Sequence, residues 1–524
     1  MENPCRIVAF GDSITRAWAP ILEHRLRSRY PDQSVEVVNA GVVSDTSVLG
    51  LERVGGILEH QPDVVLVGFG MNDWRKGVGR PDFRNAMAAI VDQLLDVGIR
   101  VLLLTINPDW QGSDTGTSPV IDSYNKDILD LAHQKKIRVV DVNSAWKRCF
   151  RQVSQGLDDD IHPSTSGCEL IVDGVMAVLT RVSTTVVWQY NGHYGLCNYR
   201  CPYCYYPTKK HYFRHTIEKW REGFLDLFGK QRVTFYLSYG EPTLGKNFYE
   251  VLDLLASEPQ WDCIITTNLS APLERLCATR LVREGRLQVN ASFHPTQRVT
   301  QGEFLAQLLV LREHGIEAPV VYVMYPEHLP NFGMHFRVFD RHGFFMHIRR
   351  FRGRYKGSDY PLAYSADERR LIASFMDSTS IRLMLTNPSA AGRLSYAGMF
   401  YLCVDNEGNV ARSPESQVYG EYGNIIDKTA RLDLEPQPLP PGVHEGSVDG
   451  TAMLLDSGLE ELTGNHIWSY ATQGGVRREN GSIHYPCREV DFSDPKVMWA
   501  LGYGSVASRL AATVARPWMM LRSS

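Results

Sequence analysis

Short apolar segments alternate with longer amphipathic segments over the first 184 residues. Apolar residues recur at helical spacing in the intervening stretches, most clearly in Phe83–Leu95 and Ile121–His133. The apolar segments are 6–10, 35–38, 64–67, 101–105 and 137–142. Strands that alternate with helices predict an α/β domain with a parallel sheet covered on both faces.

A second alternating series follows from residue 185 to about residue 430. Its predicted strands are 186–190, 233–238, 263–267, 288–293, 320–324 and 345–350. Six strands separated by helical segments fit a partial (β/α)6 barrel of the TIM type. In such barrels the chemistry gathers at the carboxyl ends of the strands.

The regular alternation ends near residue 430. Leu434–Gly442 reads LEPQPLPPG and predicts a stiff connector, so that 431–524 form a connector and an irregular carboxyl-terminal extension. Ser505–Arg516 is predicted to be a short helix that ends before Pro517. The apolar residues 518–521 behind it could dock on the chain's own domains, on a partner or on a membrane surface, and the first is expected.

Composition narrows the partners and the compartment. The 524 residues are 44% hydrophobic and 22% charged, as in soluble globular proteins. A net charge of −4 gives no global basic excess, so nucleic acid is not an expected partner. No apolar run of about eighteen residues predicts a membrane span, and no signal peptide is recognised. A cytoplasmic location is expected.

The ten cysteines are too sparse for a disulfide scaffold, but three of them lie between Cys197 and Cys204. This stretch reads CNYRCPYC, a C-x3-C-x2-C spacing. A loop of this length can bring three thiolates onto one iron–sulfur cluster and leave one iron open. A structural zinc site, with His193 as the nearest candidate for a fourth ligand, is the alternative.

Four blocks of the first domain carry candidate chemistry. The first strand runs into Gly11-Asp12-Ser13, the second ends in Asn39-Ala40-Gly41, and the third is followed by Gly70-Met71-Asn72-Asp73. Asp159-Asp160-Ile161-His162-Pro163 comes near the end of the domain. In this order the blocks resemble those of the SGNH (GDSL-like) hydrolase family over roughly residues 5–180. Alone, a serine after a strand is more often a helix cap.

The resemblance implies a flavodoxin-like three-layer α/β/α domain with serine esterase or acyltransferase chemistry. Ser13 corresponds to the nucleophile, His162 to the general base and Asp159 to the residue that orients the imidazole. The N–H of Ser13, the N–H of Gly41 and the side chain of Asn72 correspond to the oxyanion hole. A hydrolase fold that has lost its activity is the alternative.

The cysteine loop follows the first strand of the second series, and Tyr203 is an aromatic residue just before its last cysteine. This arrangement resembles the radical S-adenosylmethionine (radical SAM) superfamily over roughly residues 186–430. The resemblance implies a 4Fe-4S cluster bound by Cys197, Cys201 and Cys204. It also implies S-adenosylmethionine, whose reductive cleavage gives a radical that abstracts a substrate hydrogen. An external electron donor such as flavodoxin or ferredoxin is expected.

Further matches to this superfamily lie at strand ends. Ser238–Thr243 resembles its GGEP motif, which contacts the methionine amino group, although Tyr239 replaces a glycine. Thr266–Asn268 resembles its TNG ending, with Leu269 in place of glycine, and Ser292 lies where the fourth strand often contacts the cofactor. The cofactor-binding residues implied are Tyr203, Gly240, Glu241, Thr267, Asn268 and Ser292.

Two features near the end of the second series each allow more than one interpretation. Tyr401–Val410 resembles a degenerate SPASM or twitch extension, but with so few late cysteines no auxiliary cluster is expected, and Cys403 is predicted to be a buried thiol. Arg350, Arg352 and Arg354 could clamp a phosphate or carboxylate of the substrate, or form a solvated basic loop.

Together the motifs predict a bifunctional enzyme in which an esterase or deacylase is fused to a radical SAM enzyme. Its substrate would be an acylated metabolite, such as a carbohydrate or lipid precursor. One alternative is a radical SAM enzyme whose first domain only binds substrate. Another is a non-catalytic protein with a structural metal site.

Overall fold

The computed structural model divides into two compact units, the second of which begins at Ser183. It describes residues 5–29, 34–110, 118–179, 183–190, 196–204, 213–238, 240–297, 299–373, 389, 391–412, 420–434 and 436–439, and the strand residues 476–477 and 483–484.

The first unit is a three-layer α/β/α sandwich around a parallel sheet of five strands in the order β2-β1-β3-β4-β5. These strands are β1 (Cys5–Gly11), β2 (Val35–Gly41), β3 (Val64–Gly68), β4 (Arg100–Leu104) and β5 (Arg138–Val140). The central strands are buried on both faces, which explains why their sequences are continuous apolar runs. The expected α/β fold of this domain is confirmed.

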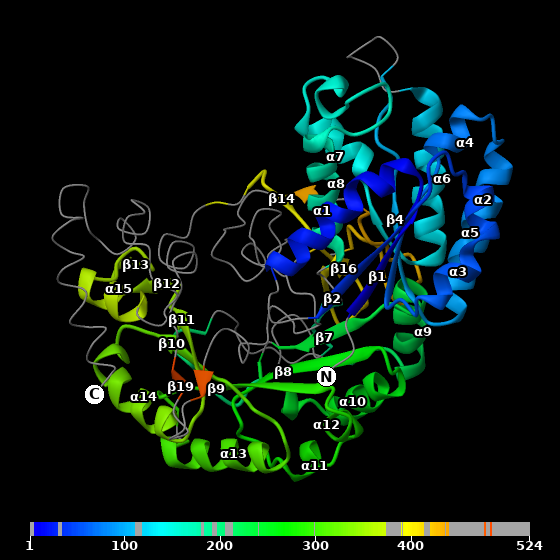
Figure 1. Cartoon of the computed structure of the whole chain (residues 1–524). Coiled ribbons are helices and arrows are strands. Elements are labelled where there is room, and N and C mark those ends of the chain that lie inside the picture. Colours follow the sequence, from blue (N-terminus) through cyan, green and yellow to red (C-terminus); the bar gives the residue numbers. More distant parts are fainter. Residues whose placement is uncertain are drawn as a thin grey trace, which may run out of the picture. The chain divides into compact units, whose positions relative to one another are not determined.

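Helices cover both faces of this sheet (Figure 1). On one face α1 (Ser13–Arg29) and α7 (Val142–Cys149) pack against α8 (Thr165–Leu179). The other face is covered by α2 (Ser47–Glu52), α3 (Val54–Glu59), α4 (Met71–Arg75), α5 (Arg80–Asp96) and α6 (Pro119–Lys135). Because all five strands are parallel, the loops that follow them meet at one edge of the sheet, where a site can form.

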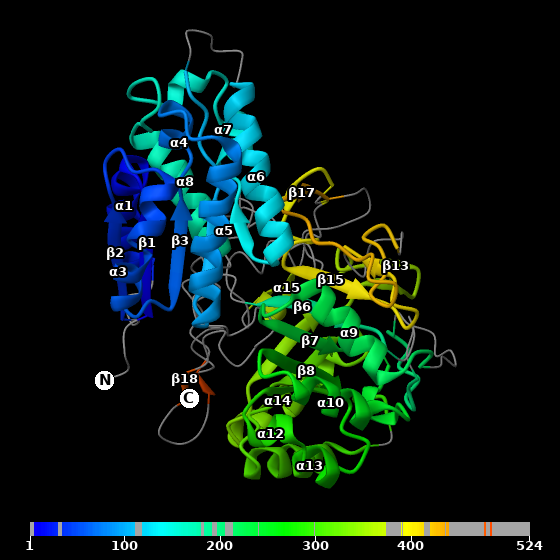
Figure 2. The same cartoon turned by 90° about the vertical axis from the view of Figure 1, so that its right-hand side faces the viewer.

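The second unit contains an eight-stranded sheet in the order β11-β10-β9-β8-β7-β6-β15-β16. Figure 2 shows β15, β6, β7 and β8 of this sheet one after another. The six strands that alternate with helices are parallel: β6 (Thr184–Trp188), β7 (Val233–Leu237), β8 (Trp261–Thr267), β9 (Leu287–Phe293), β10 (Val320–Met324) and β11 (Met346–Arg350). β15 (Tyr401–Val404) adds to β6 in parallel, and β16 (Val410–Ala411) pairs antiparallel with β15. The sheet is therefore open, with β11 and β16 at its edges.

One face of this sheet is apolar and packs on the helices of the unit. Trp188 of β6 lies 5.0 Å from the rings of both Trp220 and Phe224. These helices are α9 (Ile217–Phe228), α10 (Phe248–Ser257), α11 (Glu274–Cys277), α12 (Arg280–Arg283), α13 (Gln301–Glu313), α14 (Phe332–Arg341) and α15 (Ala366–Ala373). The alternate positions, among them Asn290 and Ser292 of β9, face the opposite side and are more polar.

The start of the predicted proline-rich connector differs from expectation. Within it, β17 (Gln437–Pro438) pairs antiparallel with β14 (Leu394–Ser395). Arg412 donates hydrogen bonds of 2.6 Å to the carbonyl oxygens of Gln437 and Pro438. Pro438 has no backbone N–H to donate, but its carbonyl oxygen can still accept such a bond. The second unit thus includes described residues past residue 430, among them Leu439 and the strand residues 476–477 and 483–484. The predicted helix 505–516 and the residues after it lie outside the described part.

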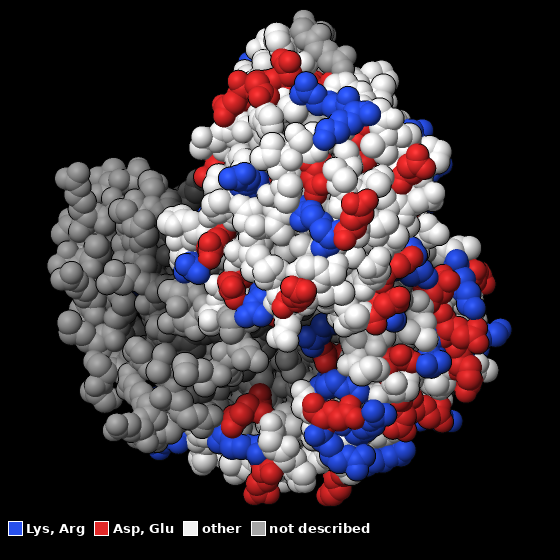
Figure 3. Space-filling view, turned by 45° about the vertical axis from the view of Figure 1, so that its right-hand side comes forward, with Lys and Arg blue, Asp and Glu red and all other residues white. Residues whose placement is uncertain are grey.

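Cys403 is buried in β15, as expected from the sequence. None of the helices in the described ranges is long and apolar enough to cross a membrane. On the face drawn in Figure 3, acidic and basic side chains of the described residues are interspersed.

Candidate active site and cofactor site

The three predicted triad residues meet at the carboxyl edge of the first sheet. Ser13 is the first residue of α1, and its Oγ lies 3.0 Å from Nε2 of His162. His162 Nδ1 lies 2.7 Å from Oδ2 of Asp159. The order hydroxyl, imidazole, carboxylate is the one that activates a serine nucleophile.

Asp159 is held as an ionised partner for the imidazole. Its Oδ1 accepts hydrogen bonds of 2.8 Å and 2.7 Å from the backbone N–H groups of Ile161 and His162. Partial burial raises the pKa of Asp159, but these bonds and the His162 ring outweigh it and lower the pKa to about 2. The carboxylate therefore stays charged at any pH at which the enzyme would work.

The predicted oxyanion donors lie at neighbouring strand ends. A Cβ on Gly41 would stand 2.5 Å from the Arg16 nitrogen, so only glycine allows β2 to end so close to the nucleophile turn. Gly41 N–H donates to Asn39 Oδ1 at 3.1 Å, and Asn72 Nδ2 donates to Asp12 Oδ2 at 3.2 Å. A bound oxyanion would compete with Asn39 Oδ1 and Asp12 Oδ2 for these two N–H donors. The Ser13 N–H lies at the amino-terminal end of α1, where the helix dipole is positive and favours a negative charge.

Asp12, next to the nucleophile, is a site residue that sequence reasoning missed. It is 2% exposed, and its Oδ1 accepts from Ile14 N–H at 2.9 Å while its Oδ2 receives the Asn72 amide. Burial raises the pKa of Asp12 to about 6, against the effect of its backbone hydrogen bonds. Its place inside the Gly-Asp-Ser block was the only available indication.

Arg53, between α2 and α3, is a second missed residue. Its guanidinium donates to Gly11 O at 2.9 Å, to Ala40 O at 3.0 Å and to Asp45 Oδ2 at 2.7 Å. It thus ties the ends of β1 and β2 together behind the nucleophile and the Gly41 donor. No motif surrounds this arginine, so nothing in the sequence indicated it.

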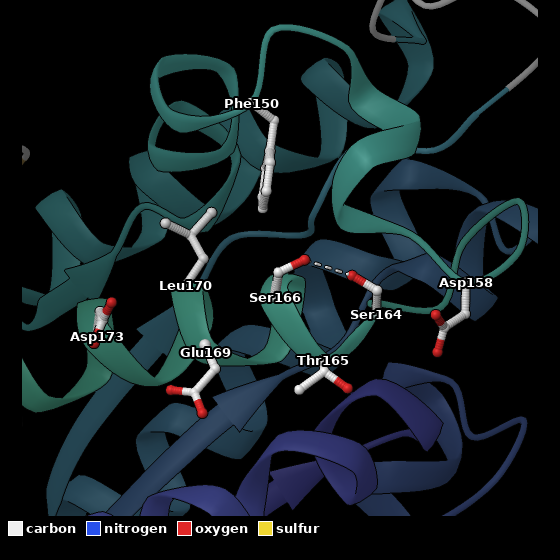
Figure 4. Close-up of a pocket in the computed structure, with 8 residues that line it drawn as sticks. All are labelled: Phe150, Asp158, Ser164, Thr165, Ser166, Glu169, Leu170 and Asp173. Atoms are coloured by element: carbon white, nitrogen blue, oxygen red, sulfur yellow. Dashed lines mark hydrogen bonds between the residues drawn. The ribbon is translucent and has the colours of Figure 1, made fainter.

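An open pocket of about 670 Å³ begins beside Asp158, the residue before Asp159 (Figure 4). More of its exposed wall is apolar than polar, although six of its eight lining residues carry a hydroxyl or carboxylate group; the lining residues are Phe150, Asp158, Ser164, Thr165, Ser166, Glu169, Leu170 and Asp173. Arg25 of α1 donates to Glu169 at 3.1 Å and to Asp173 at 2.5 Å, which compensates two of the three carboxylates. Such a wall suits a ligand that offers many hydroxyl groups.

The three predicted cluster ligands lie on one turn-like loop of the second unit. The Cys204 N–H donates to Cys201 O at 2.9 Å, and Cys197 Sγ accepts from Tyr199 N–H at 3.4 Å. Burial and then the neighbouring thiols Cys204 and Cys197 raise the pKa of Cys201 to about 12. Each thiolate thus makes it harder for the next thiol to ionise. A positively charged metal centre would stabilise all three thiolates, so this arrangement suits a metal site.

No three His, Cys, Asp or Glu side chains of the described residues are arranged to hold a single metal ion.

Glu241 is the centre of a network of hydrogen bonds that holds this loop, which we call the frame. Its backbone N–H donates to Leu196 O at 2.7 Å, next to Cys197. Its Oε1 accepts from the hydroxyl groups of Thr243 and Thr267 at 2.6 Å and 2.7 Å, and from the Thr243 N–H. Its Oε2 accepts from the Asn268 N–H at 2.6 Å and can accept one further donor. Burial raises the pKa of Glu241 despite these bonds.

Asn268 extends the frame to the loop itself. Its Nδ2 donates to Asn198 Oδ1 at 3.0 Å, and Asn198 in turn donates to Ser270 Oγ at 2.9 Å. Leu269, which stands where glycine was expected, has φ +54° and is buried. A bulky residue rarely adopts this left-handed conformation, so its backbone is strained beside the cysteine loop. Gly240 has φ +72°, which is also in the left-handed region, but glycine adopts this conformation without strain.

Tyr203 connects the loop to a cluster of aromatic residues that the sequence did not reveal. Its hydroxyl lies 2.8 Å from Nδ1 of His294, and its ring lies 5.6 Å from the ring of His328. Burial lowers the pKa of His294 to about 4 and also lowers that of His328, so both rings are neutral. Neither ring nitrogen of the buried His328 has a hydrogen-bond partner among the described residues. Their positions just after β9 and β10 were the one available indication.

The remaining predicted residues lie on β9, at the end of β11 and in the segment that follows β11. Ser292 is half-buried on the polar face of β9, beside Val321 in the register. Arg350 is buried at the end of β11, Arg352 is half-buried, and Arg354 is exposed in a hairpin, 3.7 Å from Asp359. The hairpin consists of β12 (Gly353–Tyr355) and β13 (Ser358–Tyr360). The three arginines thus differ in exposure, and the anion clamp that they could form stays a prediction.

Comparisons with known proteins divide the chain in the same way. Residues 9–170 match the model of the GDSL-like Lipase/Acylhydrolase family, and residues 192–328 match that of the Radical SAM superfamily. An esterase, TesA, from Pseudomonas aeruginosa is 32% identical over 183 residues, which are 33% of this chain and 87% of that protein. An arylesterase from Vibrio mimicus is 23% identical over 34% of this chain and 88% of its own.

Among solved structures, a lipase/acylhydrolase from Enterococcus faecalis is similar to this chain at 26% identity. The match covers 32% of this chain and 94% of that one, with a TM-score of 0.29.

Proposed function

Because residues 9–170 belong to the GDSL-like lipase/acylhydrolase family and residues 192–328 to the radical SAM superfamily, we propose that this chain is a bifunctional enzyme. One site cleaves or transfers an ester-linked acyl group, and the other carries out radical chemistry on the same metabolite or a related one. The observation that carries the first activity is the continuous relay from Ser13 through His162 to Asp159, at 3.0 Å and 2.7 Å.

The hydrolytic step follows from this relay. As Ser13 Oγ attacks the ester carbonyl carbon, its proton passes to His162 Nε2, and Asp159 stabilises the resulting imidazolium. The carbonyl oxygen gains negative charge within reach of the Gly41 N–H and the Asn72 amide. His162 then returns the proton to the departing alcohol. Water repeats the sequence in reverse and releases the acid from Ser13.

The pocket beside Asp158 supports an alcohol part that is rich in hydroxyl groups. Its Ser164, Thr165 and Ser166 hydroxyls and its carboxylates can donate to and accept from a polyol. A departing alcohol must lie on the side of His162, because that ring protonates it. An acylated carbohydrate or lipid precursor is therefore the substrate class that we favour.

The second site is proposed to hold a 4Fe-4S cluster on Cys197, Cys201 and Cys204, with S-adenosylmethionine beside it. The bound cofactors supply an electron and a carbon-centred radical. The chain's own residues fix the ligand loop: Glu241 ties it to the ends of β7 and β8, and its Oε2 retains room for one more N–H donor. Electrons would come from an external donor such as flavodoxin or ferredoxin.

A fluorophosphonate probe tests the hydrolase. We expect the wild-type chain to be labelled, and the Ser13→Ala variant to be unlabelled, because the probe reacts only with an activated serine. Asp160→Asn serves as a matched control, since that carboxylate belongs to the same loop and takes no part in the relay. Absence of labelling in the wild type would leave the first unit as a binding module.

Anaerobic reconstitution tests the second site. Iron and sulfide bound to the chain, together with 5′-deoxyadenosine formed from added S-adenosylmethionine under reduction, would support it. Bound zinc without 5′-deoxyadenosine would reject it in favour of a structural metal. Reduced protein incubated with cell extract and labelled S-adenosylmethionine would then expose metabolites that change only while Cys201 is intact.

A further inference from the structure

Exposed aliphatic side chains concentrate in one short segment of the first unit. Between β2 and the first turn of α2, Val42 is 46% exposed, Val43 57%, Val48 37% and Leu49 44%. We call these four residues the apolar rim. The other exposed large hydrophobic side chains in the described residues of this unit, Val97, Trp110 and Val120, stand singly in the sequence. Clustered apolar exposure marks a binding surface more often than scattered exposure does.

The rim is attached at both ends to the catalytic machinery. At its start, Val42 N–H donates to Gly11 O at 3.0 Å, two residues before Ser13. At its far end, Ser47 donates to the Asp73 carboxylate through both its N–H, at 3.0 Å, and its hydroxyl, at 2.5 Å. Asp73 directly follows the oxyanion residue Asn72. The segment therefore runs from the nucleophile turn to the oxyanion helix.

The polar groups of this segment bind the chain rather than solvent. Asp45 N–H donates to Val42 O at 3.2 Å, and the Asp45 carboxylate receives Arg53 at 2.7 Å. Thr46 caps α2 by accepting from Leu49 N–H at 3.3 Å, and Lys76 binds Ser44 O at 2.5 Å. A backbone fixed in this way presents its aliphatic side chains at little entropic cost to a ligand.

The chemistry of the neighbouring site indicates what covers the rim. The carbon attacked by Ser13 carries three groups: an oxygen that points to the Gly41 and Asn72 donors, the alcohol oxygen that His162 protonates, and the acyl chain. The first two directions are taken, and the segment that carries the rim begins directly after the oxyanion residue Gly41. An uncharged aliphatic surface at that place suits a hydrocarbon chain.

We propose that the apolar rim binds the acyl chain of the ester, and that the substrate carries a hydrocarbon acyl group of about six carbons or more rather than an acetyl group. This inference rests on the proposed hydrolase function and specifies which acyl groups the hydrolase prefers. Each methylene that the rim removes from water should favour the longer ester by up to about fourfold.

The test compares 4-nitrophenyl octanoate with 4-nitrophenyl acetate, and Ser13→Ala gives the blank rate for each ester. We expect the wild-type kcat/KM to be higher for the octanoate. The double variant Val43→Ser/Leu49→Ser should lower the octanoate-to-acetate ratio about tenfold. Val97→Ser, at a valine that is 60% exposed and distant from these contacts, should leave the ratio unchanged. Exposed positions tolerate such changes with little effect on folding.

The outcomes separate this inference from the proposed function. Ser13-dependent hydrolysis with no preference for octanoate, or a double variant whose ratio equals that of the wild type, would overturn the acyl-chain proposal and leave the hydrolase intact. No Ser13-dependent hydrolysis of either ester would overturn the hydrolase itself. A wild-type dimer that the double variant turns into a monomer, with an unchanged ratio, would assign the rim to self-association instead.

Discussion

The two units of this chain place their chemistry in different ways. In the first unit, Ser13 and His162 are 149 residues apart in sequence and meet at 3.0 Å because the parallel sheet brings strand ends to one edge. In the second unit, the three cysteines lie within eight residues of one another, and the fold contributes a hydrogen-bonded frame around them.

The difference follows from what would perform each of the two proposed reactions. Where side chains are the catalysts, the fold must align them within tenths of an ångström, and the relay is visible in the chain alone. Where bound cofactors supply the reactivity, the chain must hold and shield them. Glu241 illustrates this second role, because four donors from its own chain already surround its carboxylate.

The largest effect is expected from removing a cluster ligand. Cys201→Ala should abolish nearly all iron binding after anaerobic reconstitution, because two cysteines cannot retain the cluster. Cys403→Ala, which removes a buried thiol of β15, is the matched control and should bind iron as the wild type does. Iron and sulfide analysis measures both, and wild-type iron content in Cys201→Ala would contradict the ligand assignment.

The next largest effect should come from the carboxylate of the relay. Asp159→Asn is expected to lower kcat for ester hydrolysis by about 10⁴-fold, because the imidazole loses its preferred tautomer and its counter-charge. Asp160→Asn, one residue along the same loop, should retain activity. If the two variants lost activity equally, Asp159 would not be the orienting residue.

Loss of one oxyanion donor should cost less. Asn72→Ala is expected to lower kcat by about 10²–10³-fold with little change in KM, since the donor acts on charge that develops only in the transition state. Steady-state kinetics on a single ester separate the two parameters. A rise in KM with an unaltered kcat would instead make Asn72 a residue for ground-state binding.

Asp12 predicts a pH-dependent stability of the first unit. Its pKa is raised to about 6 from an ordinary value near 3.8, so its protonated form favours folding below pH 4 and that contribution is lost as the pH rises through 6. We expect the stability of the wild type relative to Asp12→Asn to fall by on the order of 3 kcal/mol between pH 4 and pH 7. Urea unfolding of both proteins across this range measures the difference. A constant difference would show that Asp12 titrates normally.

The smallest effect concerns the strained residue of the second site. Both Leu269→Gly and Leu269→Ala remove the same buried side chain, but only alanine keeps a Cβ at φ +54°. The glycine variant should be the more stable one, by about 0.5–1 kcal/mol, because the left-handed penalty exceeds glycine's entropy cost. Thermal or urea midpoints decide it, and the opposite order would mean that the strain at this position is relieved elsewhere.

Much of the fold was accessible from sequence because buried parallel strands are continuous apolar runs, as in 64–67 and 320–324. The triad was accessible because Ser13 follows the first strand and because Asp159 and His162 form a recognisable block near the end of the domain. Arg53 was not, because it acts through contacts with Gly11 and Ala40, far away in sequence, and carries no local pattern. The pairing of Gln437 with Ser395 was missed for the same reason, since a proline-rich stretch predicts extended chain but not its partner.

We propose that one chain carries two separately operating catalytic sites. This proposal is tested most directly by measuring octanoate ester hydrolysis and 5′-deoxyadenosine formation on the same reconstituted preparations of wild type, Ser13→Ala and Cys201→Ala. We expect Ser13→Ala to lose only the hydrolysis and Cys201→Ala to lose only 5′-deoxyadenosine formation. Undiminished hydrolysis in Ser13→Ala, or undiminished 5′-deoxyadenosine formation in Cys201→Ala, would contradict it.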